Sequence, residues 1–410
     1  MARTIFIAER PLRKDHCGKT IVERIRSAIV CSLEYRFGRR EAKCGPQLGA
    51  AAYQVAAYYR RFSLNDTTLR GRNPISGEPI IHQVLAHYAS RCQPNRIEAL
   101  RQAGGFSGAE FWRLQTESGT LCLRRWPREH PPAGQLQFIH DVLRHVSERG
   151  FSLVPVPFAT RRSEPPTFVA CQGHLWELTP WLPGNAGYHD QPNRAKLLAS
   201  MKTLAHFHLA ASDFPVAERQ RQPSPGIMRR QETLRRWQSN DITRLAASLN
   251  AIDDSSLRPI AADILRHFER TASSLSLQLL QATTISVRLQ PVIRDVWDQH
   301  ILFEGDAVSG LIDFGAMRID NVSTDIARLL GSLARDNEDD WQAGLDAYQQ
   351  LRPLSSDEKQ LIGTFDLSIV LLSGLNWLRW LYLENRVFPD KDAVFFRLQA
   401  ILERLRCVAI

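Results

Sequence analysis

The chain has 410 residues, of which 44% are hydrophobic and 23% are charged, so it is neither collagen-like, wholly disordered nor supercharged, and two or three packed units are expected. Its net charge of +9 is concentrated at one end. Residues 1–80 hold 15 Lys and Arg against 7 Asp and Glu, whereas residues 81–410 hold 37 against 36. Most of the protein is therefore close to neutral.

Residues 1–80 mix arginine clusters with Ala-rich and Gly/Pro-rich stretches and show no sustained helical or strand period, which predicts a poorly ordered basic extension. Positive charge of this kind can attract nucleic acid or another anionic surface. The segment has no nucleic-acid-binding motif, so such a partner is not expected. A competing interpretation is that the segment is translated from upstream of the true start, with a GTG codon at Val84 as initiator.

Residues 81–183 predict a small lobe built on an antiparallel sheet. A short amphipathic helix over 81–88 comes first, and a longer one with apolar residues at helical spacing ends at Gly150. The predicted strands cover 96–100, 110–116, 120–126, 167–172 and 174–182. The lobe ends at the Pro-Gly pair of residues 183–184.

Residues 184–410 predict a mainly helical lobe, interrupted by a strand-rich island over 286–315 whose Gly-Asp turn indicates a hairpin. The predicted helices cover 195–211, 227–238, 256–275, 340–351, 361–385 and 395–405. The arginine-rich run at 229–236 predicts a solvated helix face. Because no apolar run reaches the length of a membrane span, no membrane association is expected.

The strand-rich island also carries the most suggestive carboxylates. Asp295 follows a strand-like run, and Asp313 follows the predicted hairpin. Phosphoryl transfer needs two acids arranged in this way, because one carboxylate orients and deprotonates an acceptor hydroxyl and the other holds magnesium against the nucleotide. A charged turn without a catalytic role fits the same spacing, so the pattern alone leaves both interpretations open.

The segment RDVWDQHILFEGDAVSGLIDFGAMRIDNVSTDIARLL resembles the catalytic core of the aminoglycoside phosphotransferase and choline kinase-like superfamily. The family's usual pattern is H-G-D-x-H-x-x-N, a hairpin, I-D-[FW]-[GE] and a helix that begins D-x-A, and the resemblance extends over residues 81–410. It implies an α+β, protein-kinase-like fold of two lobes. A β-rich N-lobe would cover ATP, and a helical C-lobe would shape the acceptor pocket.

By this resemblance, Asp295 matches the catalytic aspartate, Asp313 the metal-binding aspartate and Asp325 the acid that opens the next helix. His300 stands where the family has its metal-binding asparagine. Magnesium prefers oxygen to imidazole nitrogen, so Asp298 could supply the oxygen instead. Otherwise His300 ligates a metal such as manganese, contacts the substrate, or only braces the loop.

Two further departures lie in the same loop. Ile293 and Trp297 occupy the positions of the family's two histidines, which we expect to alter the packing of the loop more than its chemistry.

A glycine-rich turn between the first two strands resembles the family's nucleotide-covering loop, in which backbone amides approach phosphates and a hydroxyl can assist. Its candidate residues are Gly104, Gly105, Ser107 and Gly108. A plain hairpin turn would have the same composition. The segment 177–184 resembles the hinge, where the backbone at Leu178 and Thr179 would meet adenine.

The third strand should present a small residue and a cation on one face, and Cys122 and Arg124 fit because residues two apart share a face. The family usually has Lys at the second position, so Arg124 is a departure, and Arg125 is the out-of-phase alternative. No acid stands at the natural place on the following helix: Gln135 occupies it, with Glu129 and Asp141 as neighbours.

The function implied by the resemblance is transfer of the terminal phosphoryl group of ATP to a hydroxyl of a small molecule, with magnesium, or else manganese, as cofactor. The alternative is a catalytically impaired pseudokinase or nucleotide-binding regulator, because several departures surround one site. Seven scattered cysteines without a metal-ligand spacing predict reduced thiols and a cytoplasmic location.

Overall fold

The computed structural model describes residues 78–100, 108–161, 166–216, 221–251, 256–388 and 390–407. The predictions made for residues 1–77, and those for Gly104, Gly105 and Ser107, lie outside the described residues.

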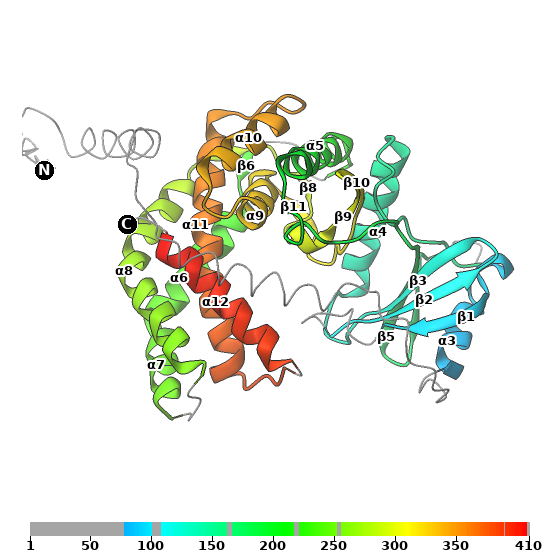
Figure 1. Cartoon of the computed structure of the whole chain (residues 1–410), viewed down its shortest axis with the longest axis horizontal. Helices are drawn as coiled ribbons and strands as arrows, with labels where there is room; N and C mark the ends of the chain where they lie inside the picture. Colours follow the sequence, from blue (N-terminus) through cyan, green and yellow to red (C-terminus); the bar gives the residue numbers. More distant parts are fainter. Residues whose placement is uncertain are drawn as a thin grey trace, which may run out of the picture. The chain divides into compact units, whose positions relative to one another are not determined.

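The first lobe is a five-stranded antiparallel sheet in the order β1-β2-β3-β5-β4 (Figure 1). Its strands are β1 (Pro94–Ala99), β2 (Glu110–Thr116), β3 (Gly119–Arg125), β4 (Phe168–Cys171) and β5 (His174–Pro180). Each predicted strand is present, with ends shifted by at most a few residues. The helix α3 (Glu78–Leu85) and a 3-10 turn (Ser90–Cys92) precede the sheet.

One face of this sheet is covered by α3. Ile81 and Val84 of the helix are fully buried against sheet residues that include Leu123 and Trp176. Trp176 also stacks on Trp112 of β2, with ring centroids 5.3 Å apart. Because strand residues alternate between faces, this packing leaves Cys122, Arg124, Glu177 and Thr179 on the opposite face.

The helix α4 (Ala133–Glu148) ends as predicted, with Gly150 in the left-handed region at φ +87°. Its apolar face does not join the core of the sheet. Ile139, Val142 and Val146 instead belong to the large core cluster of the helical lobe. The helix contacts the sheet through His140, which bonds Glu177 of β5.

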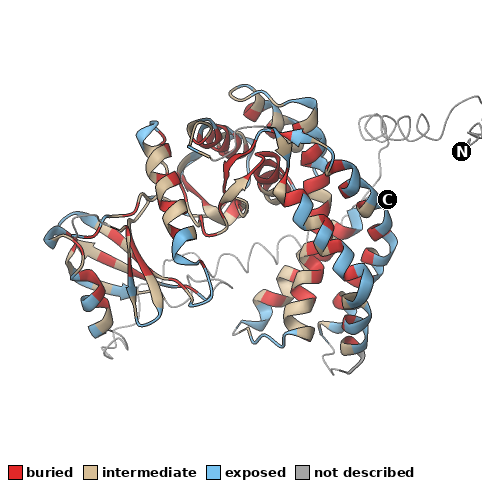
Figure 2. Cartoon of the chain, turned by 180° about the vertical axis from the view of Figure 1, so that it is seen from behind, coloured by how far each residue is buried: buried red, intermediate tan, exposed pale blue. Residues whose placement is uncertain are grey.

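The second lobe is mainly helical, and Figure 2 shows that the buried faces of its helices are turned toward one another. Its helices are α5 (Arg194–Ala210), α6 (Pro225–Arg236), α7 (Ile242–Ala251), α8 (Arg258–Ala282), α9 (Ser323–Leu333), α10 (Glu338–Gln349), α11 (Ser356–Leu378) and α12 (Lys391–Cys407), with π-helical turns at Trp237–Asp241 and Arg379–Leu383. The sequence analysis did not predict α7.

Several of these helices begin at side-chain caps. Asn193 accepts the Lys196 amide at 2.8 Å at the start of α5, and Ser224 caps α6 ahead of a proline at the first helical position. Ser355 and Glu358 form a capping box on α11. Local sequence thus fixes where these helices begin.

One helical stretch of the described residues, Ser356–Leu383, is long and apolar enough to cross a bilayer. About two thirds of its most apolar window is buried inside the protein, as expected for the central helix of a globular lobe.

The strand-rich island folds into short ribbons. The predicted hairpin is formed by β9 (Ile301–Glu304) and β10 (Ala307–Leu311). A second ribbon pairs β8 (Gln290–Val292) with β11 (Arg318–Asp320), and a third pairs β6 (Gln222–Pro223) with β7 (Ser286–Val287). The loop between β8 and β9 carries Asp295, and the loop between β10 and β11 carries Asp313.

Candidate active site

Asp325, near the start of α9, fixes the backbone of the loop that carries Asp295. Its two carboxylate oxygens accept the amides of Ile293 at 2.7 Å and Arg294 at 2.6 Å. His208 of α5 contacts the same carboxylate at 3.1 Å, and burial lowers the pKa of this histidine although Asp325 opposes the effect. The loop is strained, since Arg294 has φ +69°, and these bonds hold it in place.

Asp295 presents a half-exposed carboxylate at the end of this loop. Arg328, one helical position beyond the D-x-A motif, donates to one Asp295 oxygen from Nη2 at 2.8 Å and from Nε at 3.2 Å. Burial raises the pKa of Asp295, but Arg328, with a smaller contribution from His300, holds that pKa below its ordinary value. Asp295 is therefore ionised at neutral pH, as a general base must be.

This pair predicts a pH effect. Replacing Arg328 with Gln removes the main cause that lowers the pKa of Asp295, so that pKa rises. A base works only when deprotonated, and the acidic limb of the kcat/KM profile should therefore move to higher pH in R328Q. Arg194, whose ion pair with Asp340 lies on the surface, supplies the control R194Q, which should keep the wild-type profile. An unshifted acidic limb in R328Q would contradict the assignment of Asp295.

Asp313 is the point at which the predicted site residues from both lobes meet. One of its oxygens lies 3.1 Å from Arg124 Nη2 and the other 3.6 Å from His300 Nε2. Burial raises the pKa of Asp313, but Arg124, His300 and the Gly315 amide together hold it below its ordinary value, so the carboxylate is charged. Its backbone adopts the left-handed region at φ +61°, an uncommon conformation for aspartate that aims the side chain into the site.

His300 is held by bonds to both ring nitrogens. Nδ1 lies 2.7 Å from the carbonyl of Asp295, which can only accept, so this nitrogen carries the hydrogen. Nε2 then accepts the indole N–H of Trp297 at 2.9 Å. Trp297 and His300 are both departures from the family pattern, and they bond to each other.

Asp298 has different surroundings. It is buried, its carboxylate accepts from Gln299 at 2.6 Å, and His189 lies 3.9 Å away. Among the described residues, no hydrogen bond or ion pair joins it to Asp313 or His300. Asp298 is therefore left out of the proposed metal site. Asp313 Oδ2 and His300 Nε2 are close enough to share one cation if the indole N–H of Trp297 releases the imidazole.

The acid that partners Arg124 comes from the sheet and not from the helix. Glu177 lies directly opposite Arg124 in the β3–β5 register, with Arg124 Nη1 3.9 Å from Glu177 Oε1. Burial raises the pKa of Glu177, but a 2.6 Å bond from His140 of α4 and the charge of Arg124 lower it further. His140 also bonds Thr167 at 2.6 Å. The helix α4 thus contributes a histidine, whereas the family pattern places the acid that pairs with the β3 cation on this helix.

Gln135, at the position of the expected helix acid, instead donates to the Met317 carbonyl at 2.8 Å, just past the D-F-G segment. Arg125, the out-of-phase cation, pairs with Glu110 on the neighbouring strand. Arg124 is therefore the β3 cation that contacts Asp313.

Cys122 and Thr179 face each other in the β3–β5 register on the same side of the sheet as Arg124. Burial raises the pKa of the Cys122 thiol to about 12, so it is a small neutral group, as the wall of an adenine pocket requires. Leu178 points the other way into the sheet core, and its carbonyl accepts the Phe158 amide at 2.8 Å. We leave Leu178 out of the proposed nucleotide site.

Gly108, in the turn before β2, has φ +74°, a conformation that favours glycine.

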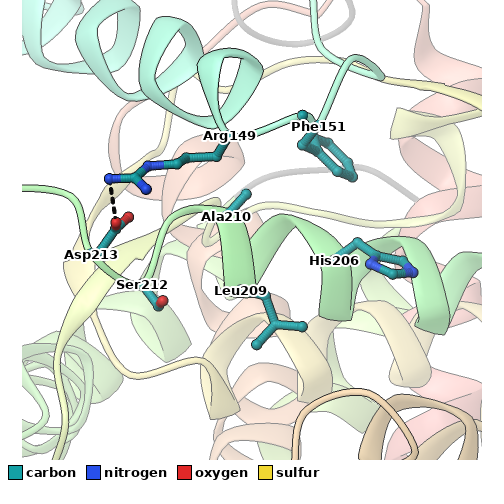
Figure 3. A pocket seen from close by; sticks show the side chains of 8 residues that line it. Arg149, Phe151, His206, Leu209, Ala210, Ser212 and Asp213 are labelled. Atoms are coloured by element: carbon teal, nitrogen blue, oxygen red, sulfur yellow. Dashed lines mark ion pairs between the residues drawn. The ribbon is translucent and has the colours of Figure 1, made fainter.

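A surface pocket lies elsewhere, between the ends of α4 and α5 (Figure 3). Arg149 and Asp213 form an ion pair at its rim, and Phe151, His206 and Leu209 line it. It shares no residue with the site around Asp295 and Asp313.

Residues 98–358 match the family described as "Phosphotransferase enzyme family". The chain belongs to this family. The predicted resemblance and the prediction of a small-molecule kinase are thereby confirmed.

Relatives and solved structures agree with this assignment. A protein named homoserine kinase from Methylocella silvestris is 27% identical over 301 residues, which cover 72% of this chain and 84% of that protein. A protein with the same name from Janthinobacterium is 26% identical over 262 residues, covering 62% of this chain and 72% of the relative. An aminoglycoside phosphotransferase from Alicyclobacillus acidocaldarius has a TM-score of 0.53 at 16% identity, covering 84% of this chain and 96% of that chain.

A structure of a spectinomycin phosphotransferase in complex with ADP and spectinomycin has a TM-score of 0.56 at 13% identity, covering 82% of this chain and 98% of that chain. These likenesses confirm the predicted α+β, protein-kinase-like fold.

Proposed function

We propose that this phosphotransferase-family protein moves the terminal phosphoryl group of ATP to a hydroxyl of a small molecule, with Asp295 as the base and Asp313 as the metal ligand. The observation that carries the proposal is the pair of ionised, partly exposed carboxylates. Asp295 is oriented by Arg328, and Asp313 is held within reach of the β3 cation Arg124. One carboxylate can accept the proton of the acceptor hydroxyl while the other faces the nucleotide.

The nucleotide would lie against the face of the sheet that carries Cys122, Arg124 and Thr179, with Gly108 in the covering turn. Arg124 supplies a permanent charge for the phosphates. A divalent cation, magnesium or manganese, would neutralise the phosphate oxygens when bound. Asp313 would be its first protein ligand and His300 its second.

Homoserine is the first acceptor to test, because several relatives carry the name homoserine kinase. Purified protein should consume ATP in the presence of homoserine and a divalent metal and yield a phosphorylated product detectable by mass spectrometry. A panel with an amino alcohol and spectinomycin, run in Mg²⁺ and in Mn²⁺, widens the search. No acceptor-dependent consumption of ATP across the panel would argue against the proposal.

The departure at His300 predicts an altered metal preference. Imidazole nitrogen suits manganese better than magnesium, whereas an amide oxygen suits magnesium. The variant H300N should therefore raise the ratio of the Mg²⁺-supported rate to the Mn²⁺-supported rate. The double variant W297H/H300N, which restores the family's pair, should raise the ratio further, since the indole N–H of Trp297 is then no longer present to bond the side chain at position 300. Equal ratios in wild type and both variants would remove His300 from the metal site.

A second candidate is a pseudokinase or nucleotide-binding regulator. It is favoured by the ion pair between Arg124 and Asp313, which occupies one oxygen of the proposed metal ligand. Titration with ATP separates the candidates: a regulator binds nucleotide in a metal-dependent manner without turnover of any acceptor, and an enzyme shows both.

We also propose a cytoplasmic location, with nucleotide and a small acceptor as partners and no role for nucleic acid. Cys92, Cys122 and Cys171 form no disulfide within the described residues, in keeping with a reducing compartment.

A further inference from the structure

Five arginines whose charges interact are called here the arginine cluster: Arg229, Arg230, Arg294, Arg318 and Arg328. Arg328 bonds Asp295, and Arg294 directly precedes Asp295 in the chain. The five arginines come from three separate parts of the chain: α6, the loop and ribbon around β8 and β11, and α9. The sequence analysis treated the first two as part of a solvated helix face. That interpretation fits Arg235 and Arg236, which are exposed, and is wrong for Arg230, whose guanidinium lies over the Phe365 ring with its central carbon 4.7 Å from the ring centre.

Carboxylates are too few to balance this cluster. Arg328 pairs with Asp295, and Arg229 lies 3.9 Å from Asp320. Within the described residues, Arg230, Arg294 and Arg318 form no ion pair. Among hydrogen bonds between described residues, Arg230 donates to the backbone carbonyl of Gly226 and Arg318 to that of Met317, and the Arg294 side chain makes none.

The charges also repel one another. Burial lowers the pKa of Arg230 to about 10, and Arg294, Arg229 and Arg328 add to the decrease although Asp320 opposes it. The pKa of Arg294 is lowered by burial and by Arg229, and that of Arg318 by the same two causes. Partly buried cations without counter-charges are costly, and a bound anion relieves that cost.

We propose that the arginine cluster binds an anionic group of the acceptor, so that the substrate is an alcohol of net negative charge, such as a hydroxy acid. This inference rests on the proposed function, because it places the acceptor at Asp295. Guanidinium groups hold carboxylate and phosphate through paired hydrogen bonds. A polycationic acceptor would be repelled, and an ammonium group on the acceptor would find the carboxylates of the cluster engaged or buried, since Asp295 pairs with Arg328 and Asp320 and Asp325 are fully buried.

The kinetic test is a matched acceptor series: 4-hydroxybutyrate, homoserine, homoserine amide and 3-aminopropanol. The value of kcat/KM should be highest for the two carboxylates and no lower for 4-hydroxybutyrate than for homoserine. In R230Q and R294Q it should fall about 10- to 100-fold for the carboxylates, as expected for a lost hydrogen bond to a charged group. It should change little for 3-aminopropanol, and the KM for ATP should stay unchanged.

The exposed Arg235 on the same helix as Arg230 gives the matched control R235Q, which should behave as wild type. If R230Q and R294Q lower kcat/KM equally for all acceptors, the variants act through folding, and the proposal fails. It also fails if they raise only the KM for ATP, because the cluster then serves the nucleotide.

Binding is tested without turnover. Inorganic phosphate and 4-hydroxybutyrate should each raise the melting temperature of the full-length protein and should do so less in R230Q and R294Q. Because each variant removes one of several repelling charges, its melting temperature without anion should equal or exceed that of wild type. Anion binding that is lost in the variants, in a protein that phosphorylates no alcohol, supports the cluster and overturns the proposed function. Turnover of alcohols without any preference for carboxylates supports the proposed function and overturns the proposed role of the arginine cluster.

Discussion

Replacing Asp295 with Asn should lower kcat by about 10²- to 10⁴-fold, the usual contribution of a positioned general base. The amide has nearly the shape of the carboxylate but cannot take the proton from the acceptor hydroxyl. The loop should keep its form, because it is held by Asp325 through the amides of Ile293 and Arg294 and not by Asp295 itself. Affinity for a fluorescent ATP analogue, measured by titration, should change little.

Loss of the Asp295 charge also leaves Arg328 without its carboxylate partner. The melting temperature should therefore be recorded beside kcat, so that a folding defect is not mistaken for a chemical one. Asp306, in the turn of the β9–β10 hairpin, is an exposed carboxylate of the same segment, and D306N supplies the matched control with wild-type kcat. Wild-type consumption of ATP by D295N with a productive acceptor would sink the assignment of the base.

The loop that carries Asp295 and the hairpin after it could be predicted from sequence because their parts are local. Asp295, the hairpin and Asp313 lie within one short segment, and their order reflects a ribbon whose turn is marked by Gly305 and Asp306. The same holds for the sheet, since period-2 alternation and glycine-bearing turns delimit its strands. The sequence also shows that Trp297 and His300 stand where the family has a histidine and an asparagine. It does not show that Trp297 and His300 bond to each other.

Partners supplied by tertiary structure escaped prediction. We sought the acid for Arg124 on α4, because the family pattern places it there. The structure brings Glu177 beside Arg124 through strand pairing, and the alternating pattern of β5 gives no sign of this, since a buried acid in a strand resembles an exposed one. Arg328 was missed although it stands three residues after Asp325, because helical spacing alone does not indicate what the side chain faces.

The arginine cluster was misjudged for a related reason. A run of arginines on an amphipathic helix usually faces water. Composition cannot show that other segments of the chain bring further arginines to the same place. Arg230 and Arg294 lie far apart in sequence, and their charges interact because α6 packs beside β11 of the β8–β11 ribbon. The charge of residues 81–410 is nearly balanced as a whole but is unbalanced at the arginine cluster, where we propose that the acceptor binds.

Replacing Arg124 with Met should raise the KM for ATP about 10- to 100-fold, because a charge-assisted contact to phosphate is lost. The variant also removes one cation from beside the buried Glu177, and the free energy of unfolding should fall by about 1–3 kcal/mol. Nucleotide titration and urea denaturation measure the two effects separately. R124K keeps the charge and introduces the family's usual residue, so it should recover most of the affinity.

The neighbouring Arg125 makes the comparison decisive. Arg125 carries the same charge as Arg124 and lies on the same strand, but it faces the other side of β3 and pairs with Glu110. R125M should leave the KM for ATP unchanged, because residues on opposite faces of a strand cannot reach the same ligand. If R125M weakens ATP binding as much as R124M does, the strand acts through its net charge and not through a positioned cation. The ion pair between Arg124 and Asp313 would then mark a closed site, as the pseudokinase hypothesis requires.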